Sequence, residues 1–169
     1  MKSPILILAP ALASTAIAGE MQLSIEVPQL DSAEYHRPYV AAWIENPDRS
    51  VATDLTVWYD AENKDGTTWL KDLRQWWRKS GRSAELPIDG VSGPTRPVGK
   101  HELDLSDKAG AIKPLAEGEY TLVVEAAREV GGREMIRIPF KWDGKTAVDT
   151  RASGKTELGA VKFSIKTEN

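Results

Sequence analysis

The fold class follows from one stretch of the chain, Arg133-Glu134-Met135-Ile136-Arg137-Ile138-Pro139-Phe140-Lys141-Trp142. Apolar and polar side chains alternate along it, so that one set would face inward and the other outward. The inward set is Ile136, Ile138, Phe140 and Trp142, and the outward set includes Arg137 and Lys141. A period of two residues is typical of a strand with one buried face. The pair Gly131-Gly132 just before it predicts a hairpin with the strand-like segment 120–127.

Further strands are expected on both sides of this hairpin. Residues 21–27 alternate in the same way, whereas residues 39–44 are apolar on both faces, as in a central strand that is covered on two sides. Together with the hairpin this makes seven expected strands, at residues 21–27, 39–44, 55–59, 101–105, 120–127, 133–142 and 160–165.

One amphipathic helix is expected between the third and fourth strands. Thr67 or Thr68 would cap its first turn, Gly81 would end it, and the charged residues between them would form a solvated face. Residues 63–66 before it predict a turn in which Gly66 takes a positive φ. The sequence therefore predicts a mainly β protein, an antiparallel immunoglobulin-like β-sandwich with one inserted amphipathic helix. The apolar stripe of this helix consists of Trp69, Leu70, Leu73, Trp76 and Trp77.

The first eighteen residues have the pattern of a secretory signal peptide. Lys2 supplies the positive end, residues 5–12 form a short apolar run, and Ala16-Ile17-Ala18 matches the small-x-small cleavage pattern. Cleavage after Ala18 would release residues 19–169 into the periplasm as a single β-sandwich domain. The chain has no cysteine, and at this length a core forms without disulfides. A net charge of −3 argues against nucleic-acid binding.

The segment Asp89-Gly90-Val91-Ser92-Gly93-Pro94-Thr95 lies in a Pro- and Gly-rich stretch, 87–99, that predicts a surface loop. Glycines let the backbone come close to a phosphate, Thr95 offers a hydroxyl, and Arg96 next to it would pair with a phosphate dianion. The same residues also suit a turn that merely reverses the chain. Pro94 fixes its own φ and removes an N–H donor beside Thr95.

This segment resembles the Asp-x-x-Ser/Thr-Gly-Ala-Thr/Ser motif of covalently flavinylated bacterial proteins. In those proteins a flavin transferase joins FMN, through its phosphate, to the hydroxyl of the last residue. The resemblance implies that Thr95 carries FMN, that Asp89 presents the segment to the transferase, and that Ser92 and Gly93 are motif positions. Pro94 departs from the motif, which has Ala there, and this leaves open whether a transferase accepts the segment.

The chain as a whole resembles a family of predicted periplasmic bacterial proteins of unknown function (DUF2271-like). Residues 35–45, 69–78 and 89–99 carry the likeness. It implies an association with flavin transferases, PepSY-type membrane proteins and iron uptake, and therefore an electron carrier with no turnover of its own. Of the adjacent pair Trp76-Trp77, one side chain is expected at the rim of the helix, and Trp77 is the candidate to shield a flavin ring.

A second hypothesis belongs to a different class. A cofactor-free β-sandwich would serve as a binding or assembly module of the periplasm, with the Pro-rich loop and Arg37-Pro38 as its contact surface. Metal binding is disfavoured, because the two histidines, His36 and His101, lie in separate segments. A hydrolase is disfavoured because Ser92 is not in a Gly-x-Ser-x-Gly context.

Overall fold

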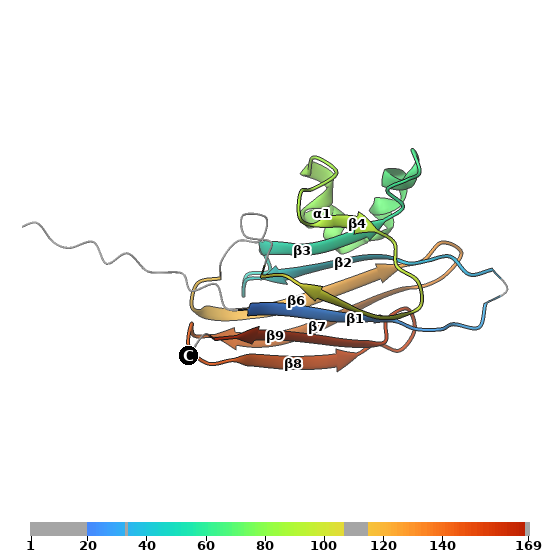
Figure 1. Ribbon diagram of the computed structural model, residues 1–169. Helices are drawn as coiled ribbons and strands as arrows, with labels where there is room; N and C mark the ends of the chain where they lie inside the picture. The colour runs from blue at the N-terminus through green and yellow to red at the C-terminus, as the bar shows by residue number, and fades with distance from the viewer. Residues whose placement is uncertain (1–19, 33, 107–114, 168–169) are drawn as a thin grey trace, which may run out of the picture.

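The computed structural model describes residues 20–32, 34–106 and 115–167, and the expected signal peptide lies outside these ranges. Two sheets lie face to face (Figure 1). The first has the strand order β5-β1-β9-β8, with bounds Gly99–Asp104, Glu20–Val27, Ala160–Lys166 and Val148–Ser153. The second has the order β4-β3-β2-β6-β7, with bounds Ser92–Pro94, Val51–Tyr59, Tyr39–Glu45, Gly118–Ala127 and Arg133–Trp142. The predicted β-sandwich is confirmed.

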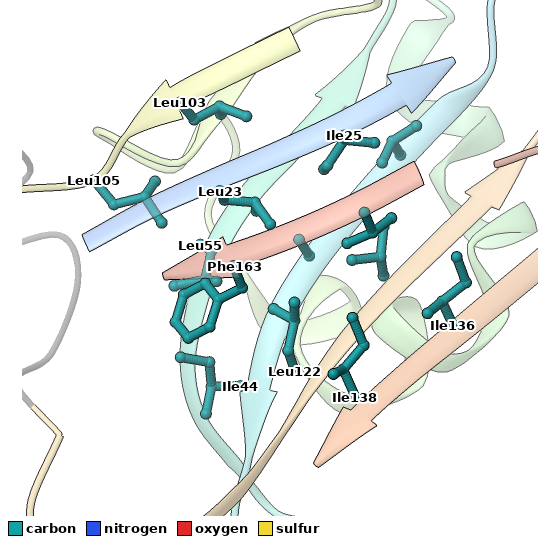
Figure 2. Close-up of a cluster of buried hydrophobic side chains, with 14 of the residues drawn as sticks. Leu23, Ile25, Ile44, Leu55, Leu103, Leu105, Leu122, Ile136, Ile138 and Phe163 are labelled. Atoms are coloured by element: carbon teal, nitrogen blue, oxygen red, sulfur yellow. The ribbon is translucent and has the colours of Figure 1, made fainter. Parts of the chain in front are cut away.

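The main core lies between the two sheets, where the alternating strands bury one face each. In β7 the four residues expected to face inward are buried, and Arg137 and Lys141 are exposed, so the predicted alternation is confirmed. The predicted hairpin is also confirmed, since β6 and β7 pair antiparallel along their whole length. Figure 2 shows part of this core, to which Leu23 and Ile25 of β1, Phe163 of β9 and Leu122 of β6 contribute side chains.

A second core explains why β2 is apolar on both faces. Val40, Ala42 and Ile44 contribute to the main core, whereas Ala41 and Trp43 belong to a separate cluster on the outer face of the second sheet. That cluster is covered by short helices, which Figure 1 shows beside β3 and β4. The prediction of a central strand covered on two sides is therefore confirmed.

The prediction of one continuous helix is wrong. A 3₁₀ helix, η1, spans Gly66–Asp72, the chain breaks at Leu73, the α-helix α1 spans Arg74–Lys79, and a 3₁₀ turn, η2, spans Gly81–Ser83. The break changes the direction of the side chains, so the apolar stripe is not continuous. Leu70, Leu73 and Trp76 are fully buried as expected, but Trp69 is 48% exposed.

The start of α1 is stabilised from another element, and not by a threonine. Neither η1 nor α1 has a side-chain cap from its own N-cap residue. Glu125 of β6 accepts hydrogen bonds from the backbone N–H groups of Gln75 at 3.0 Å and Trp76 at 2.9 Å. A buried carboxylate thus satisfies the unpaired donors and the positive end of the helix dipole. The expected cap at Thr67 or Thr68 is wrong.

The turn before η1 is confirmed, but the expected reason for its glycine is wrong. Gly66 has no positive φ, and among the described glycines that conformation is found at Gly90, Gly99 and Gly144. A Cβ at Gly66 would lie 1.8 Å from the backbone oxygen of Asp60, so close approach of two backbone segments excludes a side chain there.

Two strands were not expected. β8 is an edge strand of mostly polar residues, and β4 falls within the stretch that was predicted to be a loop. β4 pairs with β3 in parallel, with Ser92, Gly93 and Pro94 opposite Val57, Trp58 and Tyr59, so the second sheet is mixed. The loop prediction is therefore wrong for residues 92–94.

Candidate functional site

A pocket of about 500 Å³ lies at one end of the second sheet. β2 begins at this end, while β3, β4 and β6 end there, because β2 runs antiparallel to β3 and β6, and β4 runs parallel to β3. Four separate segments consequently meet around one hollow. Its lining residues are Tyr35, His36, Arg37 and Tyr39 before and at the start of β2, Asp60 and Asn63 after β3, Trp69 and Asp72 of η1, Thr95 after β4, and Ala127, Arg128, Glu129 and Val130 at the end of β6.

Thr95 is the predicted site residue that lines this pocket. Its backbone N–H donates to the carbonyl oxygen of Tyr59 at 3.1 Å, which continues the parallel pairing of β4 by one residue. The side chain is half-buried, and within the described part of the chain its hydroxyl makes no hydrogen bond. Thr95 therefore presents a free hydroxyl on a backbone that is held by the sheet.

Pro94 is accommodated by the same pairing. β4 is an edge strand, so only one of its sides bonds to a neighbour. The N–H of Val57 donates to Val91 at 2.9 Å and the N–H of Thr95 donates to Tyr59, so odd-numbered residues of this segment turn their backbone groups toward β3. The nitrogen of Pro94 therefore faces away from β3, so the missing N–H removes no hydrogen bond from the ladder. This is the edge-strand position in which sheets tolerate proline.

The residues before Thr95 build the segment. Ser92 Oγ accepts a hydrogen bond from the N–H of Ile88 at 2.9 Å, and Gly93 lies opposite Trp58 in the ladder. Asp89 is exposed in the turn that Gly90 completes with a φ of 68°. None of these three predicted residues (Asp89, Ser92, Gly93) lines the pocket.

Arg96 and Trp77 also lie away from the pocket. The Arg96 guanidinium carbon is 4.8 Å from the ring centroid of Trp58, a cation–π contact that holds the side chain against the protein. Trp77 is half-buried and packs against the second core together with Leu86 and Ile88. Neither residue is therefore among those that line the pocket with Thr95.

Sequence reasoning missed the tryptophan that does line the pocket, Trp69. Its helical spacing from Leu73 placed it in the buried stripe, and a period of 3.6 residues carries no signal of the break at Leu73. The segment 35–39 was recognised as part of a block of family likeness, and its Arg37-Pro38 as a contact surface in the second hypothesis, but it was not expected as a wall of a flavin site. Its aromatic and basic residues before a central strand were the available signal.

One hydrogen bond and one ion pair shape the pocket wall. Tyr39 Oη donates to the carbonyl oxygen of Gly66 at 3.0 Å and so fixes the start of η1 to β2. Arg128 is bound by the buried carboxylate of Glu157 through two hydrogen bonds of 2.8 and 3.1 Å. The hydrogen bond from Arg128 to Glu157 raises the pKa of Arg128, and burial raises the pKa of Tyr39.

The pocket carries charges of both signs. Arg37 and Arg128 supply positive charge, and Asp60, Asp72 and Glu129 supply negative charge. His36 lies between two acids, with Nε2 3.2 Å from Glu34 Oε1 and Nδ1 3.7 Å from Glu129 Oε2. Among the described residues there is no group of three or more His, Asp or Glu side chains that would hold a metal ion.

The comparison with protein families gives one finding. Residues 20–160 match the family model described as "Predicted periplasmic protein (DUF2271)". The chain belongs to the DUF2271 family. No match was found among the curated proteins or the solved structures. Within the described residues of this DUF2271 protein, no helix is both long and apolar enough to cross a membrane.

Proposed function

We propose that this DUF2271 protein carries FMN on Thr95 and serves as an electron carrier of the periplasm. The observation that carries the proposal is the position of Thr95. Thr95, whose hydroxyl makes no hydrogen bond within the described residues, lines a pocket that Tyr35, Tyr39 and Trp69 also line. A motif on an unrelated surface turn would place the hydroxyl in open solvent, without a hollow beside it.

The pocket fits a flavin in size and in chemistry. Its volume of about 500 Å³ falls in the range of roughly 300–1,000 Å³ that is typical of small-molecule sites. Aromatic side chains suit a planar ring system, because offset stacking of rings is favourable. Arg37 and Arg128 put positive charge in the same pocket as the hydroxyl that would carry a phosphate.

Attachment is a phosphoryl transfer from a flavin dinucleotide. A bond forms between Thr95 Oγ1 and the phosphorus of the FMN moiety, the hydroxyl loses its proton, and the bond from that phosphorus to the adenylate breaks, releasing AMP. A flavin transferase would catalyse this step from outside the pocket. Asp89 is exposed and therefore available to such a partner.

A bound FMN supplies reversible electron transfer, and the chain supplies its placement. The pairing of β4 with β3 holds the Thr95 backbone, and Tyr35, Tyr39 and Trp69 supply aromatic side chains to the lining of the same pocket. PepSY-type membrane proteins and components of iron uptake are the proposed electron partners, on the strength of family resemblance. No catalytic residue of the chain is required for this role.

The test is mass spectrometry of the whole protein after co-expression with a flavin transferase. The proposal expects yellow protein with one added FMN mass on the peptide that contains Thr95, and a bare peptide for Thr95→Val, which keeps the shape and removes the hydroxyl. Pro94→Ala restores the motif residue and serves as the control for the transferase. A bare wild-type chain beside a modified Pro94→Ala variant would reject the proposal and leave the cofactor-free binding module.

A further inference from the structure

The mouth of the pocket carries an unusual share of exposed apolar side chains. In the described ranges, three large apolar residues are exposed, namely Trp69, Val130 and Met135. Two of them, Trp69 at 48% and Val130 at 84%, line the pocket. They come from different elements, since Trp69 belongs to η1 and Val130 lies in the turn between β6 and β7. Apolar surface gathered at one hollow marks a binding site more often than single exposed residues do.

Val130 is held there in a strained backbone conformation. Its φ is 53°, in the left-handed region, and the turn is closed by a hydrogen bond from the N–H of Gly131 to the carbonyl oxygen of Arg128 at 3.0 Å. A β-branched residue with positive φ is an outlier, because Cβ crowds the backbone at a cost of roughly 1–2 kcal/mol. Asn or Gly would occupy this turn position without that strain, so folding alone does not account for a valine.

Trp69 is held in place by contacts behind it. η1 begins at Gly66, whose carbonyl oxygen is bound by Tyr39, and whose Cα packs against the backbone of Asp60 with no room for a side chain. Lys71 lies on the indole itself, with Nζ 5.6 Å from the ring centroid. The helix that carries Trp69 thus starts from a fixed point, and Trp69 lines the pocket although almost half of the residue is exposed.

We propose that Trp69 and Val130 form an apolar clamp that holds the ring system of the Thr95-linked flavin against the pocket. This inference rests on the proposed function and adds which residues bind the ring. A planar ring that docks there covers the indole and the valine side chain, and both lose surface to water. The ring is then held at both ends, through the phosphate on Thr95 and through the clamp.

The experiment uses flavinylated full-length protein and reads the ring, not electron transfer. Flavin fluorescence yield and fluorescence anisotropy report whether the ring is stacked and immobilised. Trp69→Leu is expected to raise the fluorescence yield and to lower the anisotropy. The ratio of flavin rings docked on the clamp to rings free in solvent should fall by roughly two- to tenfold. Val130→Asn is expected to change both signals in the same direction. In protein without flavin, Val130→Asn is expected to raise the folding equilibrium constant by roughly five- to thirtyfold, because the backbone strain is relieved.

Two matched controls separate the clamp from general effects. Trp77→Phe alters a half-buried tryptophan that does not line the pocket, and Arg49→Asn relieves a positive φ of 67° in the turn between β2 and β3. Neither control should change the flavin signals. Modified protein in which Trp69→Leu and Val130→Asn match the wild type would overturn the clamp and leave FMN attachment intact. Absence of the FMN mass on the wild type would overturn both proposals.

Discussion

Removal of the Glu125 carboxylate is expected to destabilise the protein by about 3 kcal/mol. The side chain is fully buried between β6 and the helical cover. It binds the N–H groups of Gln75 and Trp76 and also Arg133 Nη1 at 3.0 Å. Loss of a helix cap costs about 0.5–2 kcal/mol, and each buried donor left unpaired adds about 1–3 kcal/mol. Arg133 is 38% exposed and regains water, so the larger cost of a stranded buried charge does not apply in full.

The assay is urea unfolding at neutral pH, followed by far-UV circular dichroism and tryptophan fluorescence. Glu125→Ala should lower the free energy of unfolding by about 3 kcal/mol, and Glu125→Gln, which keeps one acceptor oxygen, by about half of that. Glu129→Gln, at an exposed position just beyond the end of β6, should stay within about 0.5 kcal/mol of the wild type. Hydrogen exchange should quicken first at residues 74–80, because α1 loses its anchor. A free energy of unfolding for Glu125→Ala within 0.5 kcal/mol of the wild type, roughly, would refute the reasoning.

Three further outcomes are expected. Burial raises the pKa of Glu45 and of Glu134, but hydrogen bonds to each carboxylate outweigh it and leave both below the ordinary value of 4.5. The unfolded chain then binds these protons more tightly, so the stabilisation contributed by Glu45 and Glu134 is present above pH 4.5 and is lost as the pH drops through the lowered pKa values. Acid titration followed by circular dichroism will show this loss. Gly66→Ala should lower the melting temperature, because its Cβ would collide with the backbone oxygen of Asp60. Pro94→Ala should leave the free energy of unfolding within about 1 kcal/mol of the wild type, since the Pro94 nitrogen faces away from β3.

The strands could be predicted from the sequence where a buried, apolar side chain recurs at every second residue. β7 and β1 carry that pattern, and β2 carries the unbroken apolar run of a strand that is covered twice. β8 alternates in burial, but its inward positions are Val148, Thr150 and Ala152, which give only a weak apolar pattern, and β4 is a three-residue strand that contains a glycine and a proline. Pairing with β3 decides that β4 is a strand, and this is a contact between residues far apart in the chain.

The helical insertion shows a second limit. The spacing of Leu70, Leu73 and Trp76 correctly indicated a buried face, but the break at Leu73 depends on partners in other elements. Glu125 of β6 binds the start of α1, and Tyr39 of β2 binds the start of η1, so the two pieces are held at separate points. Local spacing contains no record of either contact.

The candidate site was predictable at one residue and not in its surroundings. Thr95 stands out through its motif, and the pocket beside it arises only when segments 35–39, 60–72 and 127–130 meet at the end of the second sheet. Arg96 and Trp77 were expected there for their chemistry, yet Arg96 lies over the ring of Trp58 and Trp77 packs against the second core. The order of the strands in the folded sheet decides which side chains line the same pocket.

The short parallel strand β4 has a mechanical consequence for anything joined to Thr95. A group tethered to a swinging loop samples a wide volume, and its distance to a partner fluctuates accordingly. The backbone N–H of Thr95 is instead hydrogen-bonded to Tyr59, the last residue of β3. Other residues of β3 lie in both cores of the molecule. A group attached to the Thr95 side chain would therefore move with the whole sandwich. Its own rotatable bonds would set the distance that it can reach, and the orientation of the protein would set its direction.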